Sequence, residues 1–458
     1  MIEKIFKAYD VRATFPNPLS EDAAWKVGFA TAQFLKESSA AKRDGVKLAD
    51  TLVVGRDMRP HSPKLATALI EGIRSAGMNV IDVGMIDTSF IYFAINHLDA
   101  VGGIQTTASH NPAQYNGFKL CREEAIAISI ETGLAEIRDK ALAGDFKPAA
   151  AHKGTIKQQD VLEGFADHCL SFIDDISAIK PFTIAIDAGN GMAGETVPRV
   201  FKRLPCKVIP MYFDLDGTFP NHPASPLEPE NMVDLQKAVI ANGCDFGVAF
   251  DGDADRMFLV DEKAQLIGGD IVTALVGIDT IRLNPGAKVL YNLICSRSVP
   301  EAIEKAGGIP VRSKVGHSFI KKTMRDEDIP FGGEHSGHFY FKRNWFADSG
   351  MIALMQCLNV FSRAPGSVSS VIAPIDKRAR SGEVNSEVKN IPQTLQMLQD
   401  HFKDAKIDFL DGVTLQHDDW WMNVRPSNTE PLLRLNVEGD SQDVMDRHRD
   451  EALAIIRG

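Results

Sequence analysis

One structural unit occurs three times along the chain: an apolar strand, a polar loop, an amphipathic helix and a second apolar strand. Its copies span residues 51–83, 182–211 and 289–311. In the first copy we expect Ser62 to cap the helix, with Pro63 at the first helical position. A strand–helix–strand unit of this kind is typical of parallel sheets covered by helices. The repeats therefore predict three α/β domains.

The chain changes character beyond residue 370. Residues 392–402 and 441–457 have the pattern of amphipathic helices, whereas residues 420–424 and 432–437 have that of strands. We therefore expect a smaller α+β domain at the C-terminal end, of a size within the usual range for a domain. A division into several domains also suits a chain of 458 residues, which is too long for one hydrophobic core.

Three aspartates alternate on the loop at residues 251–256, between two apolar runs that are typical of strands. Carboxylates about 4 Å apart repel each other by roughly 4 kcal/mol per pair at an effective dielectric near 20, so the loop favours a bound cation. Ligands that are all oxygen indicate a hard cation, Mg²⁺ before Ca²⁺. The three residues are Asp251, Asp253 and Asp255.

Three interpretations of this acidic loop compete. An EF-hand is disfavoured because Arg256 stands where that loop needs glycine, although Glu262 has the position of its last ligand. The flanking segments also favour strands over the helices of an EF-hand. Two interpretations stay open at this point: an aspartyl-phosphate site, since an apolar strand that runs into D-x-D begins some phosphatase sites, and a solvated acidic turn.

The charge and the cysteines limit the partners of the protein. A formal net charge of −11 weighs against nucleic acid or an anionic membrane, which would need a basic face. Six cysteines lie far apart without a C-x-x-C pair, which favours reduced thiols. The first residues lack an apolar signal core, and no run of about eighteen apolar residues occurs. We expect a cytoplasmic protein with no nucleic-acid and no membrane partner.

Ser109 lies in the segment T-T-A-S-H-N-P at residues 106–112. Proline disfavours helical backbone at the residue before it, so no helix continues through Asn111. We therefore expect Ser109 on a turn, with its hydroxyl offered to solvent or to a partner. By itself the segment is most simply a polar turn. A serine that carries phosphate would, however, supply a further anionic oxygen to a metal ion held by three aspartates.

Four segments together resemble the α-D-phosphohexomutases, and within them the phosphomannomutase/phosphoglucomutase group. They occur in the order of that family and cover essentially the whole chain: T-A-S-H-N-P around Ser109, D-G-D-A-D-R at 251–256, G-E-H-S-G-H at 333–338 and R-P-S-N-T-E-P at 425–431. The resemblance implies three similar mixed-sheet α/β domains and a smaller C-terminal α+β domain around a central cleft. The boundaries that we expect are 1–152, 153–256, 257–370 and 371–458.

The resemblance also implies a metal centre. Ser109 would be a phosphoserine that holds one Mg²⁺ together with Asp251, Asp253 and Asp255. Such a group is a competent phosphoryl donor, because phosphoryl transfer depends mainly on positioning and charge neutralisation. The aspartyl-phosphate alternative is correspondingly disfavoured.

Three further residues resemble the catalytic residues of the family. Arg12 and Lys119 resemble its cations beside the phosphoserine, and Lys119 is a candidate proton shuttle. Without the resemblance, both are equally well explained as surface charges. His110 follows the serine and completes the expected catalytic group.

Substrate contacts are implied by the remaining motifs. Glu334 and Ser336 would hydrogen-bond neighbouring sugar hydroxyls, since a carboxylate can accept from two vicinal hydroxyls at once. Arg425 and the turn after it would bind the phosphate that does not react, and a helix-capping turn is an alternative compatible with that role. The residues expected to contact the substrate are Tyr9, Arg256, His317, Glu334, Ser336, His338, Arg425, Ser427, Asn428, Thr429 and Arg434.

Some histidines and three departures from the family pattern qualify this assignment. A metal site made of His335, His338 and His317 is disfavoured, because nearby glycines indicate a loop and no fourth ligand is evident. Ala13 stands where glycine is usual and cannot adopt left-handed backbone cheaply. Ile294 stands where related bacterial enzymes often carry a lysine, and His335 occupies the variable position of the sugar loop.

The expected activity is the reversible transfer of phosphate between the 6- and 1-positions of mannose or glucose. It would proceed through a phosphoserine enzyme and a hexose 1,6-bisphosphate, which would also act as activator. Phosphoglucosamine mutase is the alternative within the family. A non-catalytic sugar-phosphate-binding protein is the alternative outside it, but such a protein should lack the serine or its metal ligands. We expect small hexose phosphates as partners and a monomer or a dimer.

Overall fold

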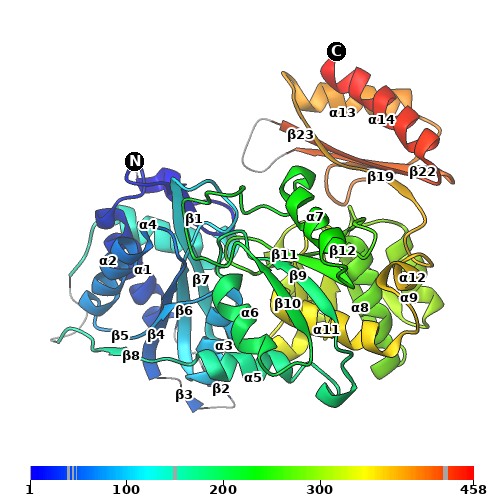
Figure 1. Cartoon of the computed structure of the whole chain (residues 1–458). Helices are drawn as coiled ribbons and strands as arrows, with labels where there is room; N and C mark the ends of the chain where they lie inside the picture. Colours follow the sequence, from blue (N-terminus) through cyan, green and yellow to red (C-terminus); the bar gives the residue numbers. More distant parts are fainter. Residues whose placement is uncertain (1, 39–41, 44–45, 48, 148–151, 427–431) are drawn as a thin grey trace. The chain divides into compact units, whose positions relative to one another are not determined.

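The computed structural model describes residues 2–38, 42–43, 46–47, 49–147, 152–426 and 432–458 (Figure 1). The chain forms two compact units, and each unit contains two separate segments. The first unit is Met1–Gly268 with Ser336–Ser369, and the second is Gly269–His335 with Ser370–Gly458. Three mixed sheets with helices and one antiparallel C-terminal sheet confirm the expected fold class.

The N-terminal part of the first unit contains the first large sheet and a separate small sheet of two strands, β2 (Lys42–Arg43) and β3 (Val46–Lys47). Its other elements are η1 (Ile2–Ile5), β1 (Val11–Thr14), α1 (Glu21–Glu37), β4 (Ala49–Arg56), α2 (Ser62–Ser75), β5 (Asn79–Met85), α3 (Thr88–His97), β6 (Ala100–Thr106), β7 (Tyr115–Arg122), η2 (Glu123–Ala125), η3 (Ile130–Leu134), α4 (Ala135–Ala143) and β8 (Ile156–Gln158). The strand order of the large sheet is β1-β7-β6-β4-β5-β8, with β6, β4, β5 and β8 parallel and β7 antiparallel to β6 and β1. Strand β4, helix α2 and strand β5 confirm the first sequence repeat.

The start of α2 differs from the expectation. His61 occupies the N-cap, and no side chain caps the helix, so the prediction for Ser62 is wrong. Ser62 is instead the first helical residue and donates from Oγ to Asp57 Oδ1 at 2.5 Å. Because the Asp57 carboxylate is buried, it needs donors from the protein, and this need outweighs the capping preference of serine.

Helices α1 and α2 pack so closely that glycine is required at their contact. A Cβ on Gly72 would lie 2.0 Å from the carbonyl oxygen of Trp25, and one on Gly28 would lie 2.2 Å from that of Leu69. We expect Gly72→Ala to lower the free energy of unfolding by about 2 kcal/mol. Overlap with rigid backbone costs up to about 3 kcal/mol, whereas alanine gains only about 1 kcal/mol over glycine in a helix.

Urea unfolding followed by tryptophan fluorescence measures this change. Gly164→Ala is the matched control, because Gly164 also lies in a helix of the first unit, Leu162–Leu170. A Cβ there would come no closer than 3.3 Å, to the flexible side chain of Phe93. We expect the control to unfold within about 1 kcal/mol of the wild type. An equal loss in both variants would show that helix packing does not explain Gly72.

The second sheet also belongs to the first unit. Its elements are α5 (Leu162–Leu170), η4 (Ile176–Ala178), β9 (Thr183–Asp187), α6 (Ala193–Phe201), β10 (Lys207–Met211), η5 (Pro229–Met232), α7 (Val233–Ala241), β11 (Phe246–Phe250), β12 (Met257–Asp261) and β13 (Leu266–Ile267). The strand order is β10-β9-β11-β12-β13. Strands β10, β9 and β11 are parallel to one another, whereas β12 is antiparallel to both of its neighbours, β11 and β13. Strand β9, helix α6 and strand β10 confirm the second repeat. The sheet continues beyond residue 256 to Ile267.

The third repeat, β14–α9–β15, is confirmed in the second unit, and the segment after it returns to the first unit. In the second unit lie α8 (Gly269–Leu283), β14 (Lys288–Asn292), α9 (Ser298–Lys305), β15 (Ile309–Ser313), α10 (His317–Asp326) and β16 (Phe331–Gly333). In the first unit lie β17 (Phe339–Phe341), η6 (Lys342–Asn344), β18 (Ala347–Asp348) and α11 (Gly350–Arg363). Strand β14 is parallel to β15 and to β16, whereas β17 and β18 are antiparallel. Helix α12 (Val368–Ile372) follows α11.

The C-terminal sheet confirms the smaller α+β domain. Its elements are β19 (Ala379–Glu387), α13 (Ile391–His401), β20 (Lys406–Asp408), β21 (Val413–Gln416), β22 (Trp420–Pro426), β23 (Leu432–Gly439) and α14 (Gln442–Arg457). All pairs in the order β19-β23-β22-β21-β20 are antiparallel. Helices α13 and α14 cover one face of this sheet (Figure 1). Their residues Leu398 and Met445 join the strands in one apolar core.

Two expectations about the whole chain can be compared with the structure. All six cysteines lie in described segments and carry free thiols. Among the described residues, no helix is both long enough and apolar enough to cross a membrane.

Candidate active site

Ser109 lies on a turn directly after β6, as the sequence predicts. Its φ of 50° is left-handed, which is uncommon for a residue other than glycine. Its Oγ donates to Asp251 Oδ2 at 2.9 Å and lies 3.1 Å from His110 Nδ1. Only 5% of the residue is exposed. The hydroxyl therefore faces the acidic loop and not the bulk solvent.

The acidic loop joins β11 to β12 and is buried. Asp251, Asp253 and Asp255 have exposed fractions of 0%, 0% and 1%, so the solvated-turn interpretation is wrong. The strands on both sides exclude an EF-hand, whose loop joins two helices. One oxygen from each aspartate lies within 4.8 Å of the other two.

Two oxygens of this loop have no donor. Oδ1 of Asp253 and Oδ1 of Asp255 accept no hydrogen bond from any described residue. Buried carboxylate oxygens normally have partners, and a hard cation such as Mg²⁺ binds oxygens of this kind. The three aspartates therefore fit the metal that the sequence predicts.

Lys119, on β7, bonds directly to two aspartates of the acidic loop. Its Nζ donates to Asp253 Oδ2 at 2.8 Å and to Asp255 Oδ2 at 2.5 Å. Burial alone would lower the pKa of this lysine, but the two carboxylates raise the pKa of Lys119 above its ordinary value. Lys119 therefore carries a proton and is not an isolated surface charge.

The acidic loop has more negative charges than bonded cations. Burial and repulsion from Asp253 raise the pKa of Asp255 to about 6. Burial also acts to raise the pKa of Asp253, but Lys119 more than offsets it, so the net pKa shift is downward. Arg256 donates from Nε to Asp251 Oδ2 at 2.9 Å. Three carboxylates thus bond directly to two cations, Lys119 and Arg256, and one negative charge is left for a metal to balance.

Arg12 reaches the Ser109 loop from β1. Its Nη2 pairs with Asp10 at 2.5 Å, and its Nη1 donates to Asn111 Oδ1 at 2.6 Å and to the carbonyl of Ala108 at 3.3 Å. Because it holds this loop, Arg12 is not an isolated surface charge either. Ala13 is in the extended strand β1, so this departure needs no left-handed backbone.

His110 and Tyr9 lie in the same part of the first unit. His110 is exposed at the surface, but desolvation by the surrounding protein, together with Arg256 and Arg12, lowers the pKa of His110 below the usual range for histidine. Tyr9 is half-buried in the bend before β1.

Ser336 and His338 belong to the first unit, which also contains the acidic loop. His338 forms an isolated bridge with Arg256, and its Nδ1 lies 2.8 Å from Asp348 Oδ2 and 3.8 Å from Asp255 Oδ1. Among the described residues, the metal-type clusters include His338 with two aspartates but no second histidine. Of the three histidines considered for a metal site, His317 and His335 belong to the second unit and His338 to the first. Asp348 was not predicted, because a single aspartate in β18 carries no motif.

Glu334 and His317 lie in the second unit. Glu334 follows β16, is 3% exposed, and accepts from Asn292 Nδ2 at 3.1 Å. His317 begins α10 after Gly316, whose φ of 131° suits glycine. Ile294 is an apolar residue and is buried, so its position supplies no cation.

Arg425 and Arg434 are paired neighbours on β22 and β23 and share one carboxylate. Glu383 lies 2.7 Å from Arg425 Nη2 and 3.4 Å from Arg434 Nη1. Arg425 Nε is buried and makes no hydrogen bond to a described residue. Ser427, Asn428 and Thr429 lie outside the described residues. Strand β23 begins at Leu432.

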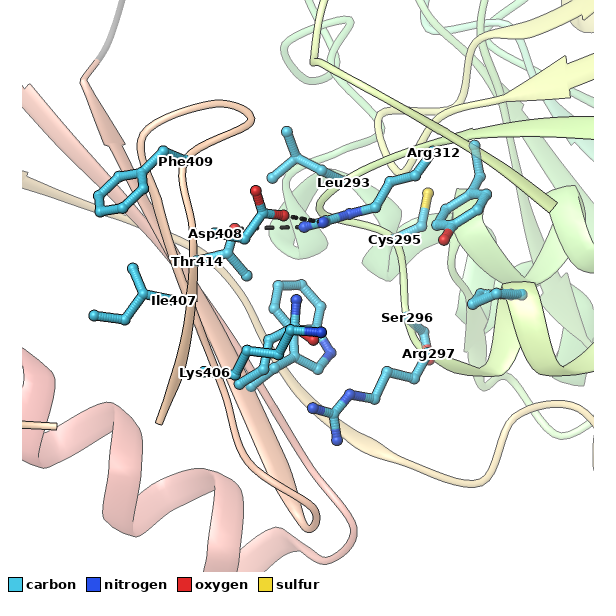
Figure 2. Close-up of a pocket in the computed structure, with 14 residues that line it drawn as sticks. Leu293, Cys295, Ser296, Arg297, Arg312, Lys406, Ile407, Asp408, Phe409 and Thr414 are labelled. Atoms are coloured by element: carbon cyan, nitrogen blue, oxygen red, sulfur yellow. Dashed lines mark hydrogen bonds and ion pairs between the residues drawn. The ribbon is translucent and has the colours of Figure 1, made fainter. Parts of the chain in front are cut away.

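A pocket of about 610 Å³ lies within the second unit (Figure 2). Arg312 of β15 forms an ion pair with Asp408 of β20 at its edge. Leu293, Arg297, Lys406 and Trp421 are among its lining residues. None of the expected substrate contacts that the structure describes is among its lining residues.

Four family models match the chain in order, and each is described as part of phosphoglucomutase/phosphomannomutase. The alpha/beta/alpha domains I, II and III match residues 3–148, 163–268 and 268–377. The C-terminal domain matches residues 383–455. The matches thus follow the order of domains that the sequence motifs predict.

Individual relatives extend this similarity over the full length. A phosphomannomutase of Salmonella montevideo is 40% identical over 444 residues, which are 94% of each chain. A protein of Xanthomonas campestris pv. campestris named phosphohexose mutases is 39% identical over 463 residues, 99% of each chain. A crystal structure of a phosphoglucomutase/phosphomannomutase family protein from Burkholderia thailandensis matches with a TM-score of 0.88 at 30% identity, covering 99% of this chain and 97% of that one.

Proposed function

Since the chain belongs to the phosphoglucomutase/phosphomannomutase family, we propose that it is a hexose phosphate mutase that interconverts the 6- and 1-phosphates of mannose, glucose or both. The observation that carries the proposal is the 2.9 Å contact between Ser109 Oγ and Asp251 Oδ2. It sets a hydroxyl nucleophile against a buried cluster of three aspartates with free ligand oxygens. The cytoplasm is its expected location.

The proposed reaction begins with a phosphate on Ser109. The Oγ–phosphorus bond breaks, a bond from phosphorus to the free sugar hydroxyl oxygen forms, and the hydroxyl proton passes in net terms to Oγ. Lys119 is the proposed shuttle, because its protonated amine can give a proton to Oγ and regain one from the sugar. The hexose 1,6-bisphosphate then turns end for end and returns its other phosphoryl group to Ser109.

Asp251, Asp253, Asp255 and the phosphate on Ser109 would hold Mg²⁺, which would neutralise charge on the transferring phosphoryl group. Arg12 and His110 border the serine and would keep its loop in position. A free hexose 1,6-bisphosphate would act as activator because it can restore the phosphate of an enzyme that has lost it.

The residues that we propose as substrate contacts belong to both units. Glu334 and Ser336 would read the sugar hydroxyls, and Arg425 and Arg434 would bind the phosphate that does not react, together with Ser427, Asn428 and Thr429. An arginine fork suits this task because it binds phosphate through two parallel hydrogen bonds. The remaining proposed contacts are Tyr9, Arg256, His317 and His338.

A coupled assay with three substrates tests the proposal. We expect turnover of mannose 1-phosphate, glucose 1-phosphate or both, at a kcat/KM at least about tenfold above that for glucosamine 1-phosphate. A factor of ten corresponds to about 1.4 kcal/mol in the transition state, which one mismatched polar group at the 2-position can supply. Preference for glucosamine 1-phosphate would favour the alternative that the protein is a phosphoglucosamine mutase. No turnover of any of the three would contradict the proposal.

A further inference from the structure

Arg59 is the largest side chain that the described residues bury completely. Its Nη1 donates to the carbonyl oxygens of Pro112 at 2.9 Å and Tyr115 at 3.0 Å. Its Nη2 donates to those of Ser109 at 2.9 Å and Asn111 at 2.6 Å. Both terminal nitrogens of the guanidinium thus bond to the backbone of residues 109–115, which we call the serine loop.

Asp57 and Phe219 hold the guanidinium from two further sides, and Gly217 packs against the backbone of Arg59. Asp57 accepts from the backbone N–H of Arg59 at 3.0 Å and lies 3.2 Å from its Nε. A Cβ on Gly217 would lie 2.4 Å from Arg59 Cα, and the ring centroid of Phe219 lies 5.0 Å from Arg59 Cζ. Because the fork is held in one orientation, it loses little freedom when it binds the loop.

The carbonyl of Ser109 connects this fork to the acidic loop. It accepts from Arg59, and a Cβ on Gly252 would lie 2.6 Å from the same oxygen, so the backbone beside Asp251 packs against it. The backbone N–H of Ser109 donates to Thr107 Oγ1 at 2.9 Å. A shift of this carbonyl would therefore change the contact between Ser109 Oγ and Asp251.

We propose that Arg59 is a positioning residue for phosphoryl transfer: by binding four carbonyls of the serine loop it holds Ser109 in its left-handed conformation against the acidic loop. This inference rests on the proposed role of Ser109 as the phosphoserine. Arg59 forms no described hydrogen bond to Asp251, Asp253 or Asp255 or to any expected substrate contact, and it bonds to Ser109 through the backbone carbonyl and not through Oγ. It therefore acts on the rate of transfer and not on the binding of substrate.

Arg59→Lys separates charge from geometry. Lysine keeps the positive charge beside Asp57, but its ammonium has three donors at one point and cannot span four carbonyls. We expect kcat to fall about ten- to a hundredfold in both directions, because a shift of about 1 Å in a reacting group can cost that much. We expect KM to change by less than about threefold, since binding of substrate is not affected.

Two measurements and a control variant make this test specific. Steady-state kinetics give kcat and KM, and rapid mixing of Ser109-phosphorylated enzyme with hexose monophosphate gives the transfer rate directly. Arg74→Lys is the control, because Arg74 also donates from Nε to a carbonyl, that of Gly154 at 2.9 Å, but far from Ser109 in the sequence. We expect the control to keep the wild-type kcat. Urea unfolding of both variants shows how much of each protein is folded.

The outcomes distinguish the inference from the proposed function. If wild-type enzyme carries phosphate on Ser109 and folded Arg59→Lys transfers it at the wild-type rate, the inference is overturned and the proposed function stands. If wild-type enzyme carries no phosphate on Ser109, the proposed function fails first. A loss of kcat that equals the loss of folded protein also overturns the inference.

A second variant tests the same contact without removing the guanidinium. Gly217→Ala would push a methyl group against the backbone of Arg59 and displace its fork from the serine loop. We expect kcat to fall at least about threefold with KM retained, since even partial misplacement slows transfer. If Arg59→Lys does not fold, the kinetics of Gly217→Ala test the inference in its place. A folded Gly217→Ala protein with wild-type kcat would overturn the inference.

Discussion

Ser109→Ala is expected to lower mutase turnover by about four to six orders of magnitude, the scale on which enzymes lose activity when the nucleophile is removed. The change deletes the oxygen that would form and break the bond to phosphorus. It also removes the donor to Asp251 Oδ2, but Arg256 still bonds to that oxygen. The fold should therefore survive, with a loss of about 1 kcal/mol for one hydrogen bond.

Labelling identifies the residue that carries the phosphate. Enzyme treated with a hexose bisphosphate labelled in its phosphate groups should hold the label in acid and lose it in the Ser109→Ala variant. Ser89→Ala is the matched control, because Ser89 is also buried in the first unit and its hydroxyl bonds to no described residue. Label that survives in Ser109→Ala and is released by hydroxylamine would transfer the role to an aspartate.

The repeated strand–helix–strand units could be predicted because they depend on local patterns. Strand β11 is apolar throughout, and such a run is buried in any α/β sheet whatever its neighbours are. The start of α2 could not be predicted in the same way. Ser62 has the sequence of a cap, but the carboxylate that turns it inward belongs to Asp57, whose burial depends on tertiary packing.

The acidic loop was predicted as a set of ligands, but its burial was not. Alternating aspartates between strands are compatible with a solvated turn when only the sequence is known. The loop is buried because residues far away in the chain cover it, among them Thr88 and Lys119, which both bond to Asp253. No local pattern encodes contacts across more than a hundred residues.

Arg59 and Asp348 show a second limit. Arg59 binds backbone carbonyls, which every residue type supplies, so its partners leave no trace in the sequence. Asp348 becomes noticeable only when the fold brings it 2.8 Å from His338. A motif search finds residues that touch a substrate more readily than residues that position them.

Asp253→Asn is expected to lower turnover by about a hundred- to a thousandfold, the usual cost of losing one preorganised electrostatic group. Oδ2 of Asp253 accepts from Thr88 Oγ1 at 2.6 Å, Thr107 Oγ1 at 3.3 Å and Lys119 Nζ at 2.8 Å. These donors would hold the amide oxygen of asparagine in the place of Oδ2. The amide nitrogen would then replace Oδ1, the oxygen left for a cation, and an amide N–H cannot ligate a metal.

The fold should tolerate this exchange, because the variant keeps the shape of the side chain and leaves two carboxylates against two bonded cations. Excess Mg²⁺ should restore part of the activity by mass action.

Asp261→Asn is the matched control, because Asp261 is also buried and lies at the end of β12 that is far from the acidic loop. Its carboxylate accepts from the backbone N–H groups of Lys263 at 2.9 Å and Gln265 at 2.8 Å. We expect it to keep wild-type turnover and Mg²⁺ affinity, as measured by kinetics and calorimetry. Two outcomes would show that the metal assignment is wrong: full activity of the wild-type enzyme in excess chelator, or binding of Mg²⁺ by Asp253→Asn as tightly as by the wild type. The aspartates would then bind only the side chains of Lys119 and Arg256.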